Sequence, residues 1–169
     1  MPSQLLRANA TRVLIVCLGA LLWGCGASPP RVPAPAELQG LPEVTVSVGP
    51  GVTGDRVQAF QAQDGSARLR NAVLDELLET KKGAGLGVAE LRISVTRFRL
   101  RSTASGVWLG GFAGADMLDV SVAVVNGGQT TRTFGTGVGG LTAGLVKPSA
   151  GGRFNGLVRA VAKRIVEKL

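Results

Sequence analysis

The chain lacks the side chains that most catalytic and metal sites require. Its 169 residues include no histidine and no tyrosine, and the two cysteines, Cys17 and Cys25, both lie near the N-terminus. Without imidazole or thiolate, the remainder of the chain cannot form a Ser-His-Asp triad, a cysteine nucleophile, or a zinc, haem or copper site that uses these ligands. Carboxylates, lysines and arginines are the acids and bases that remain. We therefore expect no enzyme activity, no metal and no cofactor.

Aromatic residues are also scarce, at 4%, whereas glycine occurs 25 times. Apolar residues make up 45% of the chain, which is enough for one core built from Val, Leu, Ile and Ala. The length suits a single domain with short accessory segments. The net charge of +8 is compatible with binding to anionic lipid headgroups, peptidoglycan or nucleic acid. Which of these partners the protein can meet depends on the cellular compartment.

The N-terminus has the pattern of a secretory signal peptide. Arg7 and Arg12 provide a positive region, and an apolar run follows over 13–23. This run is too short to span a bilayer comfortably, and its length is typical of the hydrophobic region of a signal peptide. We therefore expect export, and with it no nucleic acid as a partner.

At the end of the apolar run, Leu22-Trp23-Gly24-Cys25 resembles the lipobox of bacterial lipoproteins. The leucine, the glycine and the cysteine fit that motif, whereas Trp23 occupies a place that usually holds a small residue. The resemblance implies that Cys25 Sγ receives a diacylglycerol, that the leader is cut before Cys25, and that the new amine is acylated. Gly26 is not the Asp that marks inner-membrane retention, which favours the outer membrane. An uncleaved anchor or an ordinary secreted protein is the alternative.

A proline-rich stretch separates this motif from the rest of the chain. Five of the eight prolines fall within 27–43. Such segments favour polyproline II at ~3.1 Å per residue, so about 17 residues can hold a domain up to ~50 Å from the bilayer. We therefore divide the chain into a signal peptide (1–24), lipidated Cys25 with a linker (25–43) and a domain (44–169).

Alternation of apolar and polar residues predicts the strands of this domain. The predicted strands cover 44–48, 89–102, 118–124 and 129–136. In the second of them the apolar phase changes between Val95 and Phe98, which predicts a β-bulge at Thr96-Arg97. The last two strands flank Asn126-Gly127-Gly128, which is a hairpin turn signal.

Apolar residues at helical spacing predict two helices, over 67–81 and 152–168. Asp64 or Ser66 can cap the first helix, and Gly83 supplies its stop. The polar passage between the first strand and this helix is expected to be loosely structured.

One candidate for interaction is a row of arginines. Arg97, Arg99 and Arg101 are expected along one face of a strand, where they suit phosphate, lipopolysaccharide or an acidic partner. A solvated face that protects an exposed sheet edge is the alternative.

A second candidate is the apolar, Gly-rich stretch over 106–117. Its large residues are Trp108, Leu109 and Phe112. They either fold over the core or form an exposed patch that meets a membrane or a partner.

Two further patterns give weaker signals. The glycines of 135–140 have dinucleotide-binding spacing, but no helix pattern starts among them and no acidic residue follows about twenty positions later, so they indicate a glycine loop continuing to Gly152. Asp116 and Asp119 are the pair of carboxylates that a cryptic hydrolase would use.

With the order of elements established, Leu91 to Phe98 and Gly110 to Val125 resemble the uncharacterised bacterial lipoproteins grouped as domain of unknown function 4410. The resemblance implies an α+β fold: a single small domain with a three- to five-stranded, mainly antiparallel sheet and two helices packed on one face. Such a domain is distantly like the periplasmic domain of curli-type secretion lipoproteins. It implies no catalytic residues.

These patterns together predict a lipid-anchored protein of the outer membrane that faces the periplasm. We expect a non-catalytic binding or assembly module of the cell envelope. Its expected partners are membrane lipid, through acylated Cys25, and either another envelope protein or a second copy of the chain. The alternatives are a subunit of an oligomeric pore that inserts its Gly-rich stretch, and the hydrolase.

Overall fold

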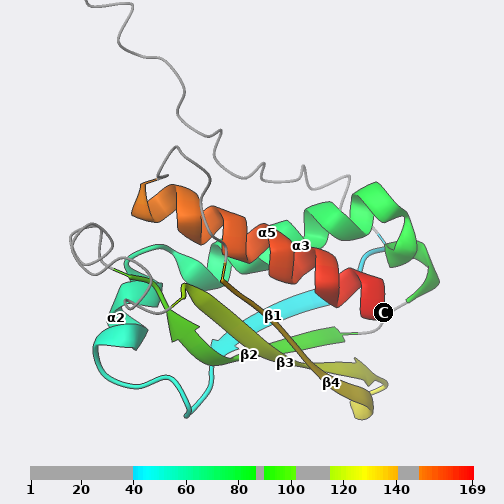
Figure 1. Cartoon of the computed structure of the whole chain (residues 1–169). Coiled ribbons are helices and arrows are strands. Elements are labelled where there is room, and N and C mark those ends of the chain that lie inside the picture. The colour runs from blue at the N-terminus through cyan, green and yellow to red at the C-terminus, as the bar shows by residue number, and fades with distance from the viewer. Residues whose placement is uncertain (1–39, 87–89, 102–114, 141–148) are drawn as a thin grey trace, which may run out of the picture.

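The computed structural model describes residues 40–86, 90–101, 115–140 and 149–169 (Figure 1). The elements, in chain order, are β1 (Glu43–Val48), α2 (Asp55–Gln61), α3 (Gly65–Thr80), the 3-10 helix η2 (Lys82–Gly85), β2 (Glu90–Arg99), β3 (Met117–Asn126), β4 (Gln129–Gly139) and α5 (Ala150–Lys168). No helix within the described residues is long and apolar enough to cross a membrane. The signal peptide, Cys25 and most of the linker lie outside these residues, so the predicted division of the chain stays a prediction.

The four strands form one mixed sheet in the order β1-β2-β3-β4. β1 pairs with β2 in parallel, and the other two pairings are antiparallel. α3 and α5 pack side by side over one face of this sheet, α3 above β1 and α5 above β3 and β4 (Figure 1). The predicted α+β fold, with a mainly antiparallel sheet and two helices on one face, is therefore confirmed.

The predicted bulge and hairpin are both present. The register of β2 against β3 shifts between Val95 and Arg97, which leaves Thr96 without a partner on β3. The extra residue keeps Phe98 on the buried face. In the turn between β3 and β4, Gly127 and Gly128 have positive φ of 57° and 80°, as a two-residue hairpin that follows the twist of the strands requires.

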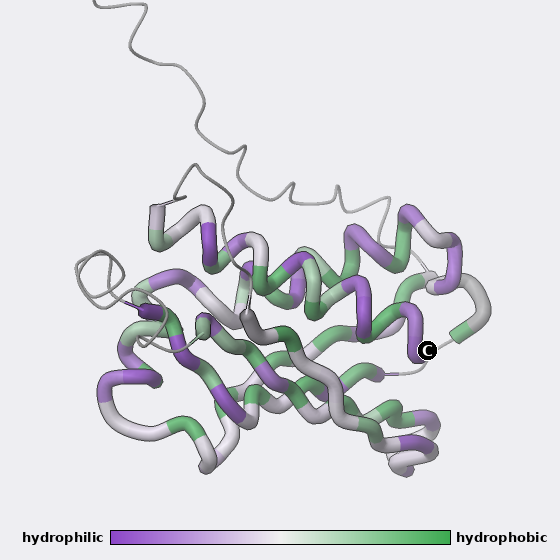
Figure 2. The backbone as a smooth tube through the Cα atoms, in the orientation of Figure 1, coloured by the Kyte–Doolittle hydropathy of each residue, from purple (hydrophilic) through white to green (hydrophobic). Residues whose placement is uncertain are grey.

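The core lies between the sheet and the helices, and Figure 2 shows hydrophobic and hydrophilic residues alternating along the elements that enclose it. At its centre, the rings of Phe60, Phe98 and Phe154 meet edge to face at centroid distances of 5.2–5.9 Å. Phe60 is the buried residue of α2. The expectation of a loosely structured passage before α3 is therefore wrong, because a seven-residue helix held by one aromatic side chain has too few apolar positions to show a period.

The first long helix also ends differently from the prediction. The left-handed conformation at its C-terminus belongs to Lys81, with φ of 54°, and Gly83 lies inside η2. A Cβ at Gly83 would collide with the side chain of Leu41. Gly83 is therefore required for close packing, and it does not terminate the helix. At the N-terminus Asp64 is the cap residue, but its side chain makes no capping hydrogen bond.

Substitution of Lys81 by Gly should raise the free energy of unfolding by about 1 kcal/mol, because glycine adopts a left-handed conformation without the Cβ clash that lysine suffers. Urea denaturation measures the change. The matched control is Lys82→Gly, which should destabilise the domain because Lys82 Nζ donates to the carbonyl of Val166 at 2.9 Å near the end of α5. Equal effects of the two substitutions would contradict this account of Lys81.

Candidate interaction surface

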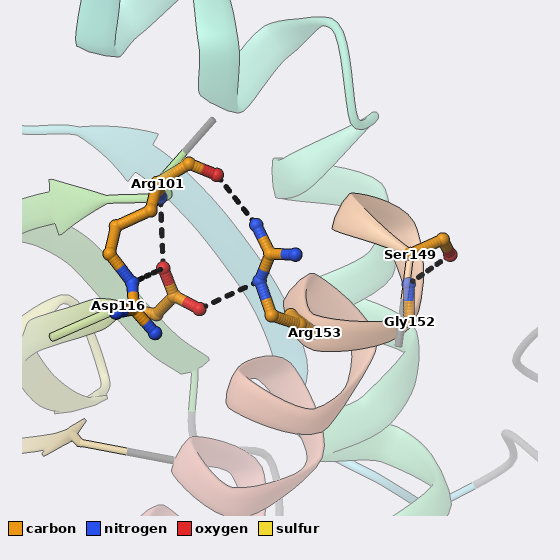
Figure 3. A network of polar contacts seen from close by, with 5 residues as sticks. All are labelled: Arg101, Asp116, Ser149, Gly152 and Arg153. Atoms are coloured by element: carbon orange, nitrogen blue, oxygen red, sulfur yellow. Dashed lines mark hydrogen bonds and ion pairs between the residues drawn. The ribbon is translucent and has the colours of Figure 1, made fainter. Parts of the chain in front are cut away.

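A buried carboxylate connects the sheet to α5 at one end of the domain (Figure 3). Asp116 is only 1% exposed. Its Oδ1 accepts hydrogen bonds from the backbone N–H of Arg101 at 2.8 Å and from Arg101 Nε at 3.4 Å. Its Oδ2 accepts from Arg153 Nε at 2.9 Å, and Arg153 Nη2 in turn donates to the carbonyl of Arg101 at 2.6 Å. We call these three residues the charged cluster.

The charged cluster holds together the ends of four elements. Arg101 follows β2, Asp116 precedes β3, and Arg153 lies in the first turn of α5. The end of β4 joins them, since the N–H of Gly140 donates to the carbonyl of Asp116 at 3.1 Å. The first turn of α5 is capped by Ser149 Oγ, which accepts from the N–H of Gly152 at 3.1 Å. The residues that flank the segments 102–114 and 141–148 therefore lie at this end of the sheet.

The predicted linker meets the domain at the opposite end. β1 begins at Glu43, which pairs with Glu90 at the start of β2. β2 contains 10 residues, so the two ends of the sheet are roughly 30 Å apart. The predicted linker therefore meets the sheet at one end, and the residues that flank 102–114 and 141–148 lie at the other.

The row of arginines is divided by the structure. Arg97 and Arg99 are exposed on the face of the sheet that α3 and α5 leave uncovered, and Arg97 Nη1 lies 3.9 Å from Asp119 Oδ2. Arg101 does not belong to this surface, because its side chain contacts buried Asp116. The expectation that all three share one exposed face is therefore corrected, and the surface is formed by Arg97 and Arg99.

Arg153 belongs to the same cluster and was not found from the sequence. Its contact with Asp116 joins residues 37 positions apart. A local pattern of hydropathy carries no information on such a pairing, and an arginine early in an amphipathic helix is most often a solvated residue. The useful signal would have been the isolated aspartate directly before a strongly apolar strand. An aspartate that is buried at such a place needs a cation beside it.

Asp116 and Asp119 do not converge on a common site. Asp116 reaches α5 on the covered face of the sheet, whereas Asp119 lies on the open face beside Arg97. No group of three or more potential metal ligands occurs among the described residues. The two carboxylates are separate and each is paired with arginine, so they do not form the convergent pair that the alternative hydrolase would need.

The glycines of 135–140 were expected to form a loop, and this expectation is wrong for most of them. Residues up to Gly139 belong to β4. Gly137 has a packing reason: Asp119 lies against it, and a Cβ at Gly137 would collide with the Asp119 carboxylate. Trp108, Leu109 and Phe112 lie outside the described residues, so their proposed contact with a membrane or partner stays a prediction.

Near the linker end, Glu90 and Arg92 form a bidentate ion pair with two contacts of 2.8 Å. The hydrogen bond from Arg92 lowers the pKa of Glu90 below its ordinary value. The pair should therefore stabilise the fold above the ordinary pKa of a glutamate, and this contribution should be lost as the pH falls through the lowered pKa. NMR titration of the Glu90 carboxyl tests the shift, and Arg92→Gln should return it to the ordinary value.

No protein-family model matches the chain, and a search of characterised proteins found no match. Solved structures of similar outline include a PelC dodecamer from Paraburkholderia phytofirmans, with 12% identity and a TM-score of 0.43, covering 79% of this chain and 92% of that one. Another is a candidate lipoprotein from Caulobacter crescentus, with 21% identity and a TM-score of 0.38, covering 79% and 86%. Similarity of this degree concerns the course of the backbone alone.

Proposed function

We propose that the chain is a lipoprotein anchored in the outer membrane and facing the periplasm, where it acts as a non-catalytic binding or assembly module of the cell envelope. The anchor is Cys25, in the motif that resembles a lipobox. The observation that carries the proposal is the division of the domain into a linker end and an end built around the charged cluster.

This division suits a tethered module. With lipid on Cys25, the start of β1 is the part of the domain that the linker draws toward the membrane. The charged cluster lies roughly 30 Å further along the sheet, so the residues that flank 102–114 and 141–148 are directed away from the point of attachment. A linker that can extend to ~50 Å allows this end to reach a partner in the periplasm.

The partners of the titratable groups support a binding role. Asp116 is paired with Arg101 and Arg153, and Glu90 is paired with Arg92. A catalytic carboxylate requires access to substrate, whereas the Asp116 carboxylate is buried and contacts two guanidinium groups.

Photo-crosslinking in intact cells tests the proposal. A crosslinking amino acid in place of Arg97, whose side chain is 74% exposed, should capture a distinct envelope protein. The matched control is the same amino acid in place of exposed Glu43 at the linker end, which should capture less of that protein. Absence of captured protein at every exposed position would refute the module. Detergent-stable oligomers that disappear on deletion of 107–115 would instead support the pore subunit.

A further inference from the structure

We infer that the outer edge of β4 is a docking edge for an extended acidic segment of a partner protein, which adds to the sheet as a fifth strand. The inference rests on the proposed function as a binding module and specifies the chemistry of the partner. It uses residues that lie apart from the charged cluster.

β4 is a terminal strand of the sheet. Residues of a strand direct their N–H and C=O groups alternately to its two sides, and the carbonyls of Gly135 and Gly137 accept hydrogen bonds from side chains of α5. These glycines therefore face the side away from β3. Across the described part of the chain, no backbone group pairs with β4 on that side. A strand edge of this kind is a template for a further strand.

Two cations of α5 occupy the carbonyls of this edge. Lys168 Nζ donates to the carbonyl of Gly135 at 2.8 Å, and Arg164 Nη1 donates to that of Gly137. Four residues of helix advance by about 6.0 Å and two residues of strand by about 6.6 Å. The i, i+4 spacing on α5 therefore places one cation at each successive outward carbonyl.

A third cation extends the basic edge. The guanidinium of Arg132 lies 5.3 Å from the centroid of the Phe134 ring, and Lys168 Nζ lies 5.9 Å from the same centroid. Within the described ranges, Arg132, Arg164 and Lys168 form no ion pair with a carboxylate. The edge thus combines outward N–H groups that have no backbone partner with cations that lack an anionic partner in this part of the molecule.

An acidic strand satisfies both features at once. Its N–H groups can replace the cations on the carbonyls of Gly135 and Gly137, and its carbonyls can accept from the outward N–H groups of the same glycines. The displaced side chains of Arg164 and Lys168 are long enough to turn toward carboxylates of the incoming strand. A second copy of β4 is a poorer occupant, because it would bring the same three cations against their own duplicates.

The test uses the full chain in mild detergent and two labelled peptides of about ten residues, the length of a long strand. One alternates Glu with Thr and Val, and the other carries Lys in place of Glu. Fluorescence anisotropy should detect binding of the acidic peptide only. In the complex, amide hydrogen exchange at Gly135 and Gly137 should slow by about tenfold or more, because their outward N–H groups become hydrogen-bonded.

Variants separate backbone pairing from charge. Gly135→Pro removes an outward N–H, and a Cβ at this position meets nothing closer than the carbonyl oxygen of Val120 at 3.9 Å. It should weaken binding about tenfold, whereas Gly135→Ala should leave it nearly unchanged. Lys168→Gln should weaken binding roughly two- to fivefold. Its control is Lys163→Gln, the same loss of charge at an exposed position of α5, with an effect below about twofold.

Four results would overturn the inference. Equal losses for Lys163→Gln and Lys168→Gln, or unchanged binding for Gly135→Pro, would mean non-specific attraction. Slowed exchange at Gly137 that rises with protein concentration without peptide would identify a second copy as the occupant. Failure of the acidic peptide to bind, while Arg97 still crosslinks an envelope protein in cells, would exclude this edge and leave the binding module intact.

Discussion

The Cys25→Ala chain should incorporate no lipid and should leave the membrane fraction. In the proposed lipoprotein, Cys25 Sγ is the acceptor of the diacylglycerol, and cleavage and acylation follow from that step. Each buried CH₂ contributes ~0.8 kcal/mol, so several acyl chains on one residue hold the domain stably, whereas one chain binds only reversibly. Radiolabelled fatty acid, followed by membrane fractionation, measures both consequences. The loss should be essentially complete.

Two controls make this result specific. Cys17→Ala changes a cysteine inside the predicted leader and should preserve labelling and membrane association. Trp23→Ala restores a small residue at the position that departs from the motif, and processing should proceed at least as fast. Label that persists in Cys25→Ala, or an absence of label in the unaltered chain, would contradict the lipoprotein and remove the physical basis for a tethered linker end.

Features encoded by neighbouring residues were predictable from the sequence. The change of apolar phase between Val95 and Phe98 predicted the bulge at Thr96, because a strand with one buried face cannot tolerate an uncompensated slip of one residue. Gly127 and Gly128 predicted the hairpin for an equally local reason, since a turn of this kind requires positive φ at both positions.

Features that depend on contacts distant in sequence were missed. Gly83 has the residue type of a helix stop, but its place is determined by Leu41, which lies against it from the start of the domain. The glycines of β4 have the spacing of a phosphate loop, but Gly137 leaves room for Asp119 of the neighbouring strand. In both cases a glycine is needed because another side chain occupies its Cβ position, and a single sequence does not reveal that neighbour.

The charged cluster is the contact of this kind with the largest expected effect on stability. Asp116→Asn should lower the free energy of unfolding by about 3 kcal/mol, because removing one member of a buried ion pair leaves guanidinium groups without their counter-charge. Two cations face this carboxylate, and the side chain of Arg153 is only 12% exposed. Thermal unfolding should shift downward by about 10 °C for a domain of this size.

The matched control is Asp119→Asn, an identical change three residues further along the chain. Asp119 lies 3.9 Å from an arginine that is 74% exposed, and such pairs contribute less than about 1 kcal/mol. Added salt should abolish the small loss of unfolding free energy in Asp119→Asn. The loss in Asp116→Asn should remain, because salt screens buried charges poorly. A double variant, Asp116→Leu with Arg153→Met, should recover part of the stability lost in Asp116→Asn. Equal stability of the two single variants would contradict a structural role for the charged cluster, and with it the rigid end of the sheet on which the proposed module depends.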